Sequence, residues 1–212
     1  LGGITRANIV KIVDNVFYDS SFGPINSSKD IEIINNFFEV KNVVNPLYSI
    51  IDIPHYGGVS ESEDIVIKNN TIKGSKMDND TKTTINTVFN IFSGKNILIS
   101  ENKISYARQV VITQNNAEGI QISDNILTNI QLVLFSLNTP TILKGNVVRG
   151  TCYAAAGEPA MFTSGGGHVV YDNTFFKVKL ASTDEQPDFG SFGTGSDEWL
   201  LNENNRIVED TE

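Results

Sequence analysis

The chain has 212 residues and a net charge of −9, from 25 acidic and 16 basic side chains. This length suits one sizeable core, and the acidic balance argues against nucleic acid or an anionic membrane as partner, since both need clustered cations. Cys152 is the only cysteine, and His55 and His168 are the only histidines, so an internal disulfide and a multi-histidine metal site are excluded. No apolar run approaches the roughly 18 residues that a membrane-spanning helix needs.

A short pattern centred on an asparagine recurs from one end of the chain to the other. Apolar residues stand five and three places before the Asn and two places after it, as Ile65, Ile67 and Ile72 do around Asn70. The alternation before the Asn is typical of a half-buried strand, and the apolar residue after it begins a second strand beyond a very short corner. The corner residues are, in chain order, Asn15, Asn36, Asn70, Asn102, Asn125, Asn146, Asn173 and, more weakly, Asn205.

A third apolar segment lies between successive corners, at residues 47–53, 87–92, 109–113, 132–137 and 160–163. Three strands per turn, each stacked on its equivalent in the next turn, predict three parallel sheets around one core. We therefore expect an all-β, right-handed parallel β-helix of about eight coils over residues 1–208, with a loop insertion or end cap at 180–198. The corner asparagines are expected to stack as a structural ladder.

Residues 65–72, 97–104 and 120–127 carry this pattern most clearly, and it resembles that of the pectate-lyase-like β-helix superfamily. That superfamily includes pectate lyases, polygalacturonases, and bacteriophage tailspike and tail-appendage proteins. The lack of disulfides and the many Asn, Ile and Phe residues look most like a tailspike fragment. This resemblance implies a polysaccharide ligand, a homotrimer, and a place on a virion or outside the cell. The chain opens without a helix that would cap its first coil, so we expect further residues before Leu1 or a neighbouring chain over that end.

In enzymes of the superfamily, substrate lies along the sheet that the third segments form here. On that sheet we expect Asn90, Thr113, Leu134 and Met161 to point outward, with Asn90 as a substrate contact. These residues include no carboxylate, and a mostly apolar face favours packing against another chain over bond cleavage. The assignment depends on a register that a shift of one residue would reverse.

The loops beside this sheet contain the candidate chemistry. Asp52, Glu61 and Asp64 are the candidate catalytic acids and His55 supports them, because cleavage of a glycosidic bond needs paired carboxylates or a base. Carboxylates on adjacent rungs would stand about 5 Å apart, near the separation in retaining glycosidases. The alternative for this group is a solvated acidic loop.

Arg108 is expected, with His55, to support the catalytic acids, and it is a candidate for recognising a carboxylate or a sugar. Tyr56 and Tyr106 are candidates for stacking on a sugar ring. Asp78 and Asp80 are the one weak Ca²⁺ site that the sequence offers, and a plain turn is the alternative. No other cofactor is expected.

These observations favour a β-helix that binds and degrades a polysaccharide, of phage tailspike type. A non-catalytic structural or receptor-binding rod is the first alternative. A secreted enzyme similar to pectate lyase is the second.

Overall fold

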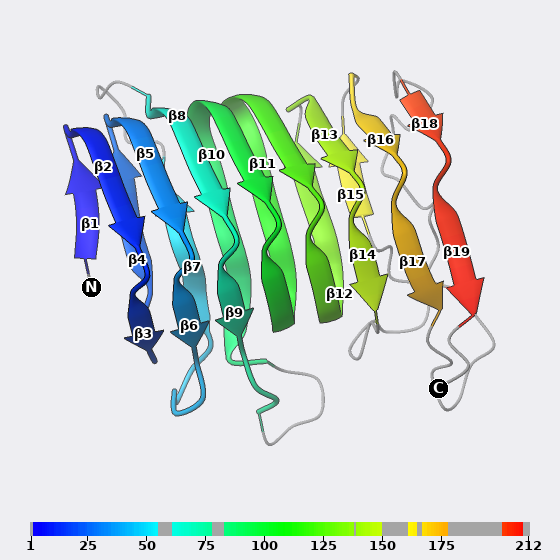
Figure 1. The fold of residues 1–212 in the computed structure, drawn as a ribbon, viewed down its shortest axis with the longest axis horizontal. Coiled ribbons are helices and arrows are strands. Elements are labelled where there is room, and N and C mark those ends of the chain that lie inside the picture. The colour runs from blue at the N-terminus through cyan, green and yellow to red at the C-terminus, as the bar shows by residue number, and fades with distance from the viewer. Residues whose placement is uncertain are drawn as a thin grey trace.

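A computed structural model describes residues 2–54, 61–77, 83–137, 139–149, 161–164, 167–177 and 201–209. Regular structure in these residues is entirely β, in nineteen strands whose mutual pairings are all parallel. The strands lie side by side along the long axis of the molecule, and the two termini lie at opposite ends of the stack (Figure 1). This arrangement confirms the all-β class and fits a parallel β-helix. The segment 180–198, predicted to be an insertion or cap, lies outside the described residues.

Successive strand pairings define three faces, which we call A, B and C. Face A consists of β1 (Gly2–Thr5), β4 (Phe22–Asn26), β7 (Leu47–Ile53), the first part of β10 (Ile85–Ser100), the middle of β11 (Lys103–Ser123), the last part of β12 (Ile126–Leu137) and β15 (Met161–Ser164). Face B consists of β2 (Asn8–Val13), β5 (Lys29–Ile34), β8 (Glu63–Lys68), the ends of β10 and β11, β13 (Thr141–Lys144), β16 (Val169–Tyr171) and β18 (Leu201–Glu203). Face C consists of β3 (Val16–Tyr18), β6 (Phe37–Glu39), β9 (Thr71–Lys73), the starts of β11 and β12, β14 (Val147–Arg149), β17 (Thr174–Lys177) and β19 (Arg206–Glu209).

The core is built from the apolar positions of the repeat. Ile65, Ile67 and Ile72 around Asn70 are completely buried, and their equivalents in the neighbouring coils are buried with them. Phe17 and Phe38 stack face to face in successive coils, with ring centroids 4.6 Å apart. Full burial of such a side chain stabilises the fold by about 1.5–3 kcal/mol, so the stacked rows hold the coils together.

The corner asparagines form the predicted ladder. Asn102 is typical: its Oδ1 accepts the backbone N–H of Asn70 at 2.9 Å and the Asn70 side-chain amide at 3.0 Å. Its own Nδ2 donates to Ile67 O and to Asn125 Oδ1, both at 3.0 Å. The same linkage runs from Asn15 to Asn205. Asn36 to Asn173 are almost completely buried, and this pattern satisfies the polar atoms that the corner would otherwise bury unpaired.

The residue before each ladder asparagine adopts the left-handed conformation. Its φ lies between 54° and 63° at Asp14, Asn35, Asn69, Glu101, Asp124, Gly145, Asp172 and Asn204. Asp, Asn and Gly tolerate this region best, which explains why they occupy nearly all of these positions. The chain can therefore turn from face B to face C within two residues.

The register of face A differs from the prediction. Thr113 pairs with Ile91, which pairs with Ile53, and all three side chains are completely buried. Leu134 pairs with Val111, which is also buried. The outward orientation expected for Thr113 is therefore wrong, because continuous apolar runs on face A gave no alternation from which to assign it.

Candidate functional site

Asp52 and Asn90 form a polar pair on neighbouring strands of face A. Asn90 Nδ2 donates to Asp52 Oδ1 at 2.7 Å. Partial burial raises the pKa of the Asp52 carboxyl, and the hydrogen bond from Asn90 opposes that shift. Asn90 alternates with the buried Phe89 and Ile91, so it lies on the outward side of face A as predicted; it is nevertheless only 2% exposed, and its Oδ1 has no hydrogen-bond partner among the described residues.

The neighbours of Asp52 along its row contain no second carboxylate. Gly23 lies on one side, so close that a Cβ on it would meet the Asp52 Cβ at 2.9 Å. Asn90, Ile112 and Phe135 follow on the other side. The pair of carboxylates that retaining glycosidases carry on adjacent rungs is therefore absent from this described row.

Glu61 and Asp64 face lysines on neighbouring rungs. Lys95 Nζ lies 3.3 Å from Glu61 and 3.6 Å from Glu118. Lys29 Nζ lies 3.4 Å from Asp64, and a hydrogen bond from Asn96 and this lysine lower the pKa of the Asp64 carboxyl. A carboxylate held in its charged form is a poor proton donor, so Asp64 is suited to binding rather than to acid catalysis.

Four residues in the left-handed conformation form a ledge where the strands of face B begin. Ile9, Asp30, Asp64 and Asn96 occupy equivalent positions on β2, β5, β8 and β10, with φ between 54° and 59°. Asn96 Nδ2 donates to Asp64 Oδ1 at 3.0 Å. The ledge presents carboxylate and amide groups on successive rungs, about 4.8 Å apart.

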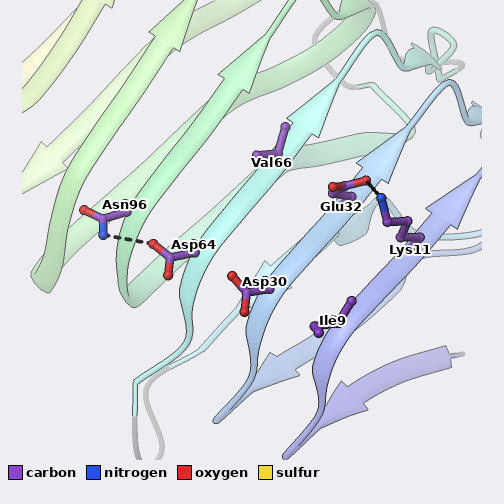
Figure 2. Close-up of a pocket in the computed structure, with 7 residues that line it drawn as sticks. All are labelled: Ile9, Lys11, Asp30, Glu32, Asp64, Val66 and Asn96. Atoms are coloured by element: carbon purple, nitrogen blue, oxygen red, sulfur yellow. Dashed lines mark hydrogen bonds and ion pairs between the residues drawn. The ribbon is translucent and has the colours of Figure 1, made fainter.

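A shallow hollow of about 420 Å³ lies against this ledge (Figure 2). Beyond the ledge it is lined by Lys11, Glu32 and Val66 of the same strands. Lys11 and Glu32 are joined by a 2.8 Å ion pair, whereas Asp30 makes no hydrogen bond or ion pair with the other described residues that line the hollow (Figure 2). The hollow thus combines apolar patches at Ile9 and Val66 with several hydrogen-bonding groups.

A second exposed row crosses face A. Tyr48, Asn86 and Arg108 are aligned by the pairing of Leu47 with Ile85 and of Ile85 with Ala107. Arg108 Nη1 donates to Asn86 Oδ1 at 3.2 Å, and Tyr48 is 61% exposed. Sequence reasoning selected Arg108 but missed Tyr48, because its place beside Arg108 depends on the register across a long loop.

The remaining predicted site residues are not brought together by the described structure. Tyr106 is partly exposed in a left-handed turn before face A. His55, Tyr56, Asp78 and Asp80 lie outside the described residues. Within the described part of the chain no group of three or more His, Cys, Asp or Glu side chains is arranged to hold a metal, and no helix could cross a membrane.

The chain has a distant likeness to one solved structure. No family model matches the chain, and no curated protein matches it. The solved structure of the surface protein and adhesin PfbA of Streptococcus pneumoniae is similar over 98% of this chain, with 13% sequence identity and a TM-score of 0.49. The chain spans 66% of the length of that structure.

Proposed function

We propose that this β-helix binds a polysaccharide, with the hollow on face B as the binding site. The observation that carries the proposal is the ledge of Asp30, Asp64 and Asn96, which repeats hydrogen-bonding groups at each rung beside apolar patches. Sugar hydroxyls pair well with carboxylate and amide groups, and the apolar side chains suit the C–H faces of a pyranose ring. Because the hollow is rich in carboxylates, the ligand is a neutral or amino sugar chain.

Binding without cleavage is the function that the geometry supports best. The described row of Asp52 contains no partner carboxylate, and two of the three acids that line the hollow, Glu32 and Asp64, are paired with lysines. The chain is then a binding rod, the first alternative named from the sequence.

Cleavage is a second candidate function, favoured by the half-buried Asp52. Partial burial favours the protonated form of the Asp52 carboxyl, which is the form that a general acid needs. The second catalytic carboxylate would have to come from another part of the face A surface. Assays for reducing sugar and for unsaturated uronate on capsular and cell-wall glycans test this function, and loss of turnover in Asp52→Asn is expected if it is correct. Absence of turnover by the intact protein on every glycan would remove it.

The binding proposal is tested with a variant that alters the ledge but keeps its backbone. Asn tolerates the left-handed conformation, so Asp30→Asn with Asp64→Asn removes both charges without strain. We expect at least a tenfold loss of affinity for oligosaccharides, since each charge-assisted hydrogen bond contributes about 1 kcal/mol or more. The probes are cello-oligosaccharides, maltodextrins and chitosan oligomers, titrated by calorimetry.

The matched control is Asp14→Asn with Asp124→Asn, the same change at exposed left-handed positions outside the hollow. This control should bind as the unaltered protein does. An equal loss in both double variants, or no binding of any probe at millimolar concentration, would show that the hollow is not a sugar site.

The proposal also includes the winding, the location and the oligomeric state expected from the sequence. We keep right-handed winding, since crossovers between parallel strands have that hand in nearly all proteins. A polysaccharide ligand agrees with a location outside the cell or on a virion, and with a tailspike-like trimer. Sedimentation of the full chain tests the trimer, because a stable 23.3 kDa monomer would exclude it.

A further inference from the structure

Face C carries four outward cations along the length of the rod. Lys73, Lys103, Arg149 and Arg206 are all exposed, on β9, β11, β14 and β19. Each of the four is adjacent in sequence to a member of one row of aligned residues. In β9, β11 and β14 the members of this row are Ile72, Ile104 and Val148, which are buried. Because side chains alternate along a strand, the cations project from the opposite side of the sheet, toward solvent.

These cations differ from most of those of face B in their partners. On face B, Lys11, Lys29, Lys68 and Lys95 each lie within 4.0 Å of a carboxylate, whereas Lys144 lies over the Tyr171 ring. Within the described structure none of the four cations of face C has such a partner. The only carboxylate among the described outward side chains of face C is Glu39, which is paired with Lys41 at 2.8 Å. The acidic residues of the left-handed corner border this face but make no ion pair with its four cations.

Two of the cations lie over aromatic rings of the same face. Lys73 Nζ is 5.3 Å from the centroid of the Phe37 ring, and the Arg149 guanidinium is 3.9 Å from that of Phe176. Such contacts restrict a flexible side chain while leaving its N–H groups free to donate. The charges are therefore held at the surface of face C before any ligand arrives.

We propose that face C binds a linear acidic polysaccharide, lying along the axis of the rod. Lys73 and Lys103 are on neighbouring rungs, and Arg149 and Arg206 follow at intervals of two rungs, or about 10 Å. One rung is close to the length of one pyranose unit in an extended chain, so uronate groups on alternate sugars meet Lys103, Arg149 and Arg206 in turn. The hydroxyl groups of Thr71, Ser105, Thr128 and Thr174 lie between the cations and suit the sugar hydroxyls.

The same features disfavour a nucleic acid as the occupant. Single-stranded nucleic acid binds proteins largely by stacking its bases on open aromatic faces. Here Phe37 and Phe176 each have a face covered by a cation, and Tyr18 packs edge-on against Phe37 with centroids 6.5 Å apart. The net charge of −9 also repels a dense polyanion more than a chain with one charge per disaccharide.

The test compares two triple variants that change the net charge equally. The first is Lys103→Gln, Arg149→Gln and Arg206→Gln on face C, all at exposed positions. The matched control is Lys68→Gln, Lys95→Gln and Lys144→Gln on face B. Binding of fluorescein-labelled hyaluronate is measured by anisotropy at 20 and 150 mM NaCl, with alginate, dextran sulfate and a poly(dT) oligonucleotide as competitors. Circular dichroism establishes that both variants fold, and the three single variants of face C replace the triple variant if it does not.

We expect the face C triple variant to lose about tenfold or more in affinity at low salt, while the control loses less than twofold. Hyaluronate whose carboxylates have been reduced to alcohols should not bind. An equal loss in the control, undiminished binding of the reduced polymer, tighter binding of poly(dT), or binding of none of the three acidic polysaccharides would each overturn the proposal. The inference does not rest on the hollow of face B, since the Asp30→Asn and Asp64→Asn variant should bind hyaluronate normally.

Discussion

Replacing one asparagine in the middle of the ladder should be far more damaging than replacing one at its end. Asn102→Ala removes four hydrogen bonds, two accepted from Asn70 and two donated to Ile67 and Asn125. At about 1 kcal/mol for each bond, plus the cost of leaving the Asn70 N–H buried without a partner, the loss is about 4–6 kcal/mol. Most domains are stable by only about 5–15 kcal/mol, so this change approaches the limit for folding.

Equilibrium unfolding in urea measures the effect, with Asn15→Ala as the control. Asn15 is exposed, and its amide donates to Asn36 and Val13, so its replacement should cost less than about 1 kcal/mol. Equal losses for the two variants would refute the view that burial makes the ladder strong. If Asn102→Ala does not fold, Asn102→Asp gives a second measure, because its ionised carboxylate would face the Ile67 and Asn125 oxygens and should be less stable at pH 7 than at pH 4.

Three further outcomes follow from single residues. The pKa of Asp52 is raised above its ordinary value of 3.8 in the folded protein. The stability that this carboxyl contributes is therefore fully present below pH 3.8 and is lost as the pH rises through the folded pKa. Asp52→Asn does not titrate, so its stability relative to the unaltered protein should increase from acid to neutral pH, as measured by urea titrations at each pH. Ile9 is 72% exposed with φ 59°, a conformation that β-branched residues avoid, so Ile9→Asn should raise stability by about 1 kcal/mol, seen as a higher melting temperature. Gly145 has φ 63°, a conformation that L residues avoid, so Gly145→Ala should cost about 1 kcal/mol in the same measurement, and a neutral result would contradict the left-handed corner.

The ladder could be predicted from the sequence because its cause is local and repeated. Each coil places an Asn between an alternating strand and an apolar residue, and the spacing survives loops of different length. The left-handed residue before each Asn was equally visible as Asp, Asn, Gly or Glu, but its role emerged only with the backbone angles. The strand Leu47–Ile53 was also predicted within its observed bounds.

Face A was harder to predict because its strands lack alternation. Ile50 and Ile51 are both completely buried, as are Val110 and Val111, so a period of two cannot be read from either pair. The strand Phe22–Asn26 was missed for another reason, since its Gly-Pro step is typical of a turn.

The surroundings of the candidate acids were beyond prediction from the sequence. Asp52 meets Asn90 across 38 residues, and Asp64 meets Asn96 across 32. These partners are set by how loops of unequal length bring the coils into register. The sequence therefore identified the candidate carboxylates, but not whether a lysine would form an ion pair with each one or an amide would donate a hydrogen bond to it.

The asparagine ladder also gives the rod a polarity. Every Oδ1 accepts from the coil before it, and every shared amide donates to the coil after it. Cut at any rung, the surface of the later coil would present the ladder Oδ1 atoms, and the surface of the earlier coil would present the Asn N–H groups that donate to them. Coils can therefore be duplicated, grafted or stacked end to end only in the same direction, while a two-fold axis across the rod would set acceptor against acceptor. Engineered extension of this protein by repeated coils should succeed in head-to-tail order alone.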